Sequence, residues 1–86
     1  MGEYLAMNAK EAVALRIQAL CAERDMAINA LAYRAGIPSS TIYSMLNTKS
    51  KNPGVVSIQK ICDGLGISVR EFFDDPLFEN LEQEIK

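Results

Sequence analysis

The sequence predicts an all-α fold in a single domain, and three observations lead to this prediction. Apolar residues recur at the spacing of amphipathic helices, and no useful length of chain alternates polar and apolar residues as a strand does. Capping residues and glycines separate the helical segments at short intervals. The 86 residues, 49% of them hydrophobic, have room for one small core and no second domain.

Residues 1–7 are predicted to form an N-terminal arm, and the first helix follows it. Asn8 and Glu11 have the spacing of a capping box, in which each side chain bonds the other residue's amide. The helix is expected to end at Arg24 and Asp25. Its buried stripe is predicted to comprise Val13, Ile17, Leu20 and Cys21.

Two short helices are predicted next, over about 28–35 and 39–47. Gly36 supplies the left-handed turn between them, because only glycine adopts that conformation cheaply. Such short helices on a tight turn must cross steeply, and small residues are needed at the crossing. Ala32 and Ala35 are small enough for this role, and Ile37 and Ile42 are expected to fill the wedge.

A polar loop over 48–54 is followed by a helix over about 55–65, which Gly66 ends. Ser68 and Glu71 open a short helix that extends through Phe73. The main predicted core set is Met26, Leu31, Ile37, Ile42, Leu46, Ile58, Ile61 and Leu65.

An additional C-terminal helix is predicted within an acidic segment, residues 74–86. Asp75 and Pro76 resemble a cap and a first helical residue. The apolar stripe of this helix would be Leu77, Phe78, Leu81 and Ile85. Two interpretations stay open, since the stripe could pack on its own domain or pair with another chain.

Charge is distributed unevenly along the chain, although its net value is only −2. No Asp or Glu lies between Met26 and Cys62, and this window has a net charge of +4. Residues 1–25 sum to −1 and residues 63–86 to −5. A polyanion would therefore be attracted by the middle of the chain and repelled by its C-terminal third.

The outward positions of the predicted 39–47 helix are polar and uncharged: Ser39, Ser40, Thr41, Tyr43, Ser44 and Asn47. A helix fits the DNA major groove only if its outward side chains are short or hydrogen-bonding and free of negative charge. Serine and threonine hydroxyls bond several base edges, so direct readout would be weakly selective. Tyr43 could instead pack on the following helix.

The spacing of these residues resembles the Cro/repressor-type (Xre-like) helix-turn-helix family of transcriptional regulators. The matching residues lie within 13–73 and include Leu31-Ala32-x-x-Ala35-Gly36-Ile37-x-x-Ser40-Thr41-Ile42, Asn47-x-Lys49-x-Lys51-x-Pro53, Ile61-Cys62-x-x-Leu65-Gly66-Ile67-Ser68 and Glu71-Phe72-Phe73. The resemblance implies a five-helix, lambda-repressor-like DNA-binding domain over residues 8–73.

The resemblance also implies which residues contact DNA. The residues implied to contact bases are Ser39, Ser40, Tyr43 and Ser44. The residues implied to contact the DNA backbone are Ile28, Thr41, Asn47, Lys49, Lys51 and Asn52. Ile28 departs from the family, which often has a phosphate-binding glutamine at that position, so only backbone amides remain available there. A solvated basic loop is the alternative interpretation of Lys49 and Lys51, and Arg16 and Lys10 are expected to be plain surface residues.

Composition argues against an enzyme. The chain has no histidine, no metal-ligand cluster, no phosphate-binding glycine loop and no nucleophile–base arrangement, so no cofactor, metal or small-molecule ligand is expected. Cys21 and Cys62 fit buried thiols in a reducing cytoplasm. No apolar run approaches the roughly 20 residues of a membrane span, and no signal peptide is visible.

The predicted function is a sequence-specific transcriptional regulator, a repressor, that binds double-stranded DNA as a homodimer in the cytoplasm. A module this small makes few phosphate contacts, so tight binding favours two copies on a palindromic site. The alternative is a helix-turn-helix scaffold that binds a protein, as an antitoxin-like or polymerase-associated module. The acidic C-terminal third favours this alternative.

Overall fold

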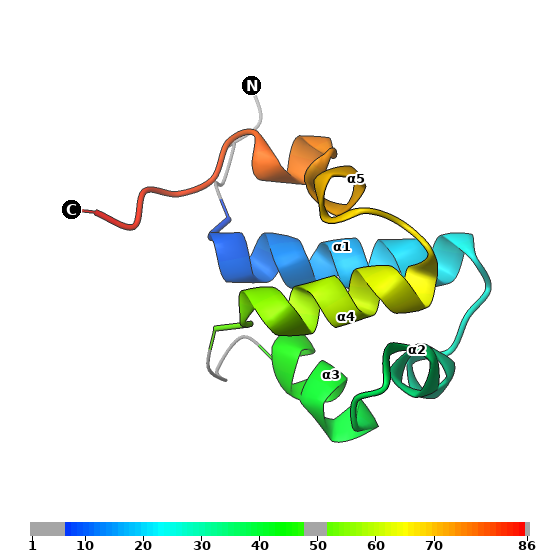
Figure 1. The fold of residues 1–86 in the computed structure, drawn as a ribbon. Helices are drawn as coiled ribbons and strands as arrows, with labels where there is room; N and C mark the ends of the chain where they lie inside the picture. Colours follow the sequence, from blue (N-terminus) through cyan, green and yellow to red (C-terminus); the bar gives the residue numbers. More distant parts are fainter. Residues whose placement is uncertain (1–6, 48–51, 86) are drawn as a thin grey trace.

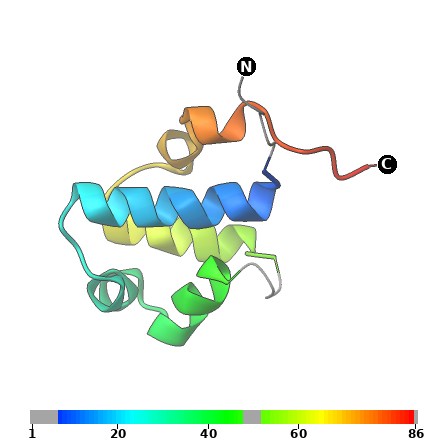
Figure 2. The same ribbon diagram turned by 180° about the vertical axis from the view of Figure 1, so that it is seen from behind.

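The computed structural model describes residues 7–47 and 52–85, and the described part is helical (Figure 1). Its elements are α1 (Ala9–Glu23), α2 (Ile28–Ala35), α3 (Ser39–Leu46), α4 (Val55–Leu65), α5 (Val69–Phe73) and the 3-10 turn η1 (Pro76–Phe78). Helix α5 and η1 lie on one side of α1, and the α2–α3 pair lies on the opposite side, as both Figure 1 and Figure 2 show. The α2–α3 pair is therefore held away from the C-terminal segment.

The helix starts follow the predicted caps. At α1, the Asn8 side chain accepts from the Glu11 amide at 2.8 Å, and the Glu11 side chain accepts from the Asn8 amide at 3.0 Å. At α5, the Ser68 hydroxyl accepts from the Glu71 amide at 3.0 Å. Each bond satisfies an amide that the helix itself leaves without a partner.

Two glycines end their helices in the same way. Gly36 (φ 70°) and Gly66 (φ 75°) adopt the left-handed conformation after α2 and α4. The next amide then reaches back over the last turn, from Ile37 to the Ala32 carbonyl at 3.1 Å and from Ile67 to the Cys62 carbonyl at 3.0 Å. Both isoleucines pack on the core, so each turn fixes the direction of the following segment.

One continuous core joins all five helices. The largest fully buried side chains are Phe72, Ile17, Leu31, Ile42, Ile61 and Cys62. Five members of the predicted core set are buried, and Met26, Ile37 and Leu46 are partly buried against them. Cys21 and Cys62 are buried free thiols, and burial raises the pKa of each.

Helix α4 lies close against the end of α2 at Gly64. A Cβ atom at this position would lie 3.0 Å from the Ala35 amide nitrogen. The absence of a side chain therefore allows the two helices to pack, and buried Ala35 contributes a small surface from the other side.

The prediction of a C-terminal helix over residues 77–85 is wrong. After the Asp75 side chain accepts from the Leu77 amide at 2.9 Å, only η1 forms. In a continued helix the Glu82 amide would donate four residues back, to Phe78, but it donates to the Met7 carbonyl at 3.0 Å. Phe78 packs instead against Phe72 and Phe73, with ring centroids 6.2 and 4.9 Å away.

Charge also disfavours a helix over 77–85. Glu79, Glu82 and Glu84 fall in this segment, and its sequence includes no lysine or arginine to pair with them. Like charges three residues apart on a helix repel one another. The predicted apolar stripe is accordingly divided, because Leu77, Phe78 and Leu81 are half-buried while Ile85 is 87% exposed.

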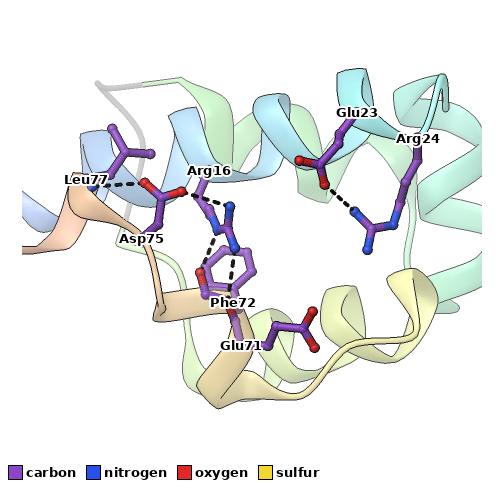
Figure 3. Close-up of polar contacts among 7 residues, drawn as sticks. All are labelled: Arg16, Glu23, Arg24, Glu71, Phe72, Asp75 and Leu77. Carbon is purple, nitrogen blue, oxygen red and sulfur yellow. Dashed lines mark hydrogen bonds and ion pairs between the residues drawn. The ribbon is translucent and has the colours of Figure 1, made fainter.

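Arg16 was predicted to be a plain surface residue, and this is wrong. Its guanidinium connects α1 to the end of α5 and to η1 (Figure 3). It donates to the Phe72 carbonyl at 2.7 Å, the Glu71 carbonyl at 3.0 Å and the Asp75 carboxylate at 3.0 Å. The side chain is only 12% exposed, and two of its acceptors are backbone carbonyls in the last turn of the short helix α5.

Candidate nucleic-acid interface

Helix α3 has one buried and one exposed face. Ile42 and Met45 enter the core and hold the helix against the rest of the domain. On the other face Ser40 and Ser44 are exposed, and Tyr43 is 52% exposed, so its ring is not sealed beneath α4. Ser39, at the start of the helix, is half-buried. The four residues predicted to contact bases thus lie on one helix, three of them on its accessible face.

A hollow of about 290 Å³ lies between α3 and the start of α4. Its walls are Ser40, Thr41, Ser44 and Met45 from α3, and Asn52, Pro53, Gly54 and Ser57 from the other side. Hydroxyl and amide groups predominate, and among the residues that the structure describes none of the lining side chains is charged. The hollow can therefore accept a hydrogen-bonding group without repelling an anion.

Ser57 is a site residue that sequence reasoning missed. It is the third residue of α4 and lies in the same hollow as the α3 hydroxyls. A serine in the acid-free first turn of a helix that follows Pro53 and Gly54 was the available signal.

The residues predicted to contact the DNA backbone are less uniformly exposed. Asn47 and Asn52 are exposed and Thr41 is half-buried. Ile28 is half-buried with its side chain against the core, so only its backbone could serve a ligand. Lys49 and Lys51 lie outside the described residues.

Three helices begin without a side-chain cap. The N-cap residues of α2, α3 and α4 are Ala27, Pro38 and Gly54, none of which has a side-chain acceptor. None of these helices has an acidic residue in its first turn. Their first amides and the positive ends of their dipoles are therefore available to an anion.

The exposed face of α2 adds an aromatic and a cationic side chain. Tyr33 is 88% exposed, and Arg34 next to it is also exposed. Because no carboxylate occurs from Met26 to Cys62, neither side chain has an acidic neighbour along this stretch of sequence. The α2–α3 surface is consequently polar to cationic.

Within residues 7–47 and 52–85, no group of three His, Cys, Asp or Glu side chains could hold a metal ion. No helix in these two stretches has the length and apolar character needed to cross a membrane.

Comparison with known proteins identifies the type of domain. Residues 16–76 match the family model of the Cro/C1-type HTH DNA-binding domain. The crystal structure of the prophage Lp1 protein 11 is similar, with 35% sequence identity, a TM-score of 0.77, and coverage of 87% of this chain and 99% of that one. No match was found among the curated proteins.

Restriction-modification controller proteins are also similar in structure. Wild-type C.Esp1396I shares 26% identity with a TM-score of 0.68, covering 76% of this chain and 82% of its own. The structure of C.Esp1396I bound to a 19 base pair DNA duplex has a TM-score of 0.71 at 24% identity, with coverage of 86% and 96%. At 24% identity, the comparison with the DNA-bound protein shows that the two chains share a fold.

Proposed function

Because this chain belongs to the family of Cro/C1-type helix-turn-helix DNA-binding domains, we propose that it is a sequence-specific transcriptional repressor. In this proposal α3 enters the major groove of duplex DNA, and bound protein blocks access to an overlapping promoter. The observation that carries the proposal is the accessible, carboxylate-free face of α3, in a stretch of chain where α2 and α4 also begin without side-chain caps.

Base edges are contacted by Ser39, Ser40, Tyr43 and Ser44. Hydroxyls both donate and accept, so they bond several base types, and direct contacts alone discriminate modestly. Tyr43 has the largest exposed side chain on α3 and provides both an apolar ring and a polar tip. Sequence-dependent DNA shape supplies further selectivity.

Phosphates are held on both sides of α3. The first amides of α2, at Ile28, bind one phosphate, as anions commonly bind helix starts. On the other side Thr41, Asn47, Lys49, Lys51 and Asn52 contact the backbone, and Ser57 joins them from α4. These contacts position the helix and make the affinity fall with salt.

Two copies bind a palindromic site in this proposal. A single small module makes few phosphate contacts, and a second copy doubles them. The two half-sites then lie about 34 Å apart, one helical turn of the duplex.

Selection from random DNA followed by titration tests the proposal. We expect selection to yield a two-fold symmetric site. Lys51→Ala should weaken binding to selected and random duplexes alike and reduce the salt slope by about 1. Ser40→Ala and Ser44→Ala should weaken binding to the selected site several-fold and change the base preference.

Arg70→Ala is the matched control, because it removes one exposed cation from α5, on the far side of α1 from α3. It should change the affinity much less than Lys51→Ala. Equal losses on selected and random DNA for the two serine variants would argue against base reading. Absence of binding at low salt would favour a protein partner instead.

A further inference from the structure

The serine hydroxyls that line the hollow beside α3 are not used within the protein. In the described part of the chain, the hydroxyls of Ser40, Ser44 and Ser57 have no hydrogen-bond partner. Ser68, by contrast, uses its hydroxyl to cap α5, at 3.0 Å from the Glu71 amide. The three serines of the hollow can therefore bond water or a ligand on the surface of α3.

Ser57 is less accessible than the two serines of α3 that share the hollow. It is half-buried, whereas Ser40 and Ser44 are exposed. The hollow measures about 290 Å³, and a water molecule in the liquid occupies about 30 Å³. A group bound on the exposed face of α3 is therefore more accessible to Ser40 and Ser44 than to Ser57, and several water molecules fit between.

The chemistry of the lining suits water. A water molecule in a protein needs two to four polar partners, and each serine hydroxyl both donates and accepts a hydrogen bond. The side-chain amide of Asn52 adds further donors and an acceptor at the edge of the hollow. A bridging water is nearly as favourable in enthalpy as a direct hydrogen bond, and protein–DNA interfaces commonly contain such bridges.

We propose that Ser57 contacts the DNA backbone through water held in this hollow, and that the same water bonds Ser40 and Ser44. The inference rests on the proposed DNA-binding function and extends it to a recognition residue outside α3. In the complex the hollow keeps its water, so the affinity depends both on the Ser57 hydroxyl and on the activity of water.

The test compares Ser57→Thr with Ser57→Val. Threonine and valine have nearly the same shape, because both are branched at Cβ, and only threonine has the hydroxyl. Gln59→Ala is the control, since this exposed residue of α4 is not among those that line the hollow. Affinity for the selected duplex is measured by fluorescence anisotropy at increasing concentrations of betaine and, separately, of sucrose, with thermal unfolding to verify the fold.

Without added solute, the valine variant should bind about three- to tenfold more weakly than the threonine variant, as expected for the loss of one hydrogen bond. The valine variant releases the hollow water on binding and the threonine variant keeps it. Lower water activity favours the binding event that releases more water, so the ratio of the two dissociation constants should shrink with either solute. The control should stay within about twofold of wild type.

Two results would overturn the inference. Equal affinities for the valine and threonine variants would show that the Ser57 hydroxyl does not take part in binding. A ratio that both solutes left unchanged would show that this hydroxyl contacts the DNA directly. A wild-type protein that binds no duplex at low salt would contradict the proposed function instead.

Discussion

Two regions of this domain differ in whether side chains bond the first amides of their helices. In the capped half, formed by α1, α5 and η1, side chains of Asn8, Ser68 and Asp75 bond the first amides. In the acid-free half, residues 26–62, which contain α2, α3 and the greater part of α4, the N-cap residues have no side-chain acceptor. All eleven acidic residues lie outside residues 26–62.

Capped helix starts contribute to the stability of the fold, whereas uncapped helix starts leave amides that can bind an anion. A capped helix start has an internal partner for its amides and gains about 1 kcal/mol from it. An uncapped start forgoes that gain and leaves its amides for an external anion. The acid-free half therefore has the electrostatic and hydrogen-bonding properties that a phosphate requires, and the capped half contributes stability.

The largest expected effect is on the capped half. Arg16→Ala removes three hydrogen bonds, to the Asp75 carboxylate and to two carbonyls of α5, and with them the polar link between α1 and the C-terminal elements. We expect a loss of about 2–4 kcal/mol in the free energy of unfolding, measured by urea denaturation.

Arg24→Ala is the comparison for that variant. Its guanidinium pairs at 3.2 Å with Glu23, whose side chain is 71% exposed. Exposed pairs contribute little, so the loss should stay below about 1 kcal/mol. Similar losses for the two arginines would contradict the role assigned to Arg16.

A smaller effect is expected when a cap is introduced into the acid-free half. Ala27→Asp gives α2 a side-chain acceptor and a favourable charge at its start, and should raise stability by about 1 kcal/mol. The same carboxylate occupies the place proposed for a phosphate, so we expect about tenfold weaker DNA binding, equivalent to about 1.4 kcal/mol.

Ala27→Ser separates the two consequences, because it supplies the cap without the charge. It should stabilise the fold to a similar degree and reduce the affinity much less. If the aspartate variant kept wild-type affinity, a phosphate contact at the start of α2 would be ruled out.

The smallest expected effect concerns the core that both halves share. Burial raises the pKa of Cys21 and Cys62 above the ordinary 9.0. The unfolded chain therefore loses its thiol protons at lower pH than the folded chain. The contribution of the protonated thiols to stability is complete well below the ordinary pKa of 9.0 and declines as pH rises through and above that value.

Urea denaturation between pH 7.5 and 10 measures this decline. A variant with Cys21→Ala and Cys62→Ala should be less stable at neutral pH but should show a flatter dependence over the same range. Parallel curves for the two proteins would indicate that other groups cause the decline.

Local patterns were sufficient to predict much of the fold. Asn8 with Glu11, Ser68, Gly36 and Gly66 each act within a few residues of their partners, so the sequence reveals them. The exposed polar face of α3 is likewise a consequence of helical periodicity. These features predicted the five helices and the accessibility of Ser40, Tyr43 and Ser44.

The predictions that were wrong or incomplete depend on contacts between residues that are far apart in the sequence. Arg16 bonds carbonyls 55 and 56 residues away, and no side-chain pattern marks a carbonyl as an acceptor. The amide of Glu82 bonds Met7, which an amphipathic stripe over 77–85 could not reveal. Ser57 lines the hollow beside α3 because the fold brings the start of α4 next to that helix. The sequence pattern did not reveal this placement either.

The paired glycine turns have a consequence for the thermodynamics of association. Gly36 and the isoleucine that follows it fix the start of α3 against the core. Helix α3 is therefore preorganised, and it would lose little conformational entropy on binding to duplex DNA. Calorimetry on a duplex should accordingly give a heat-capacity change of the size expected for rigid surfaces, without the larger decrease that accompanies coupled folding.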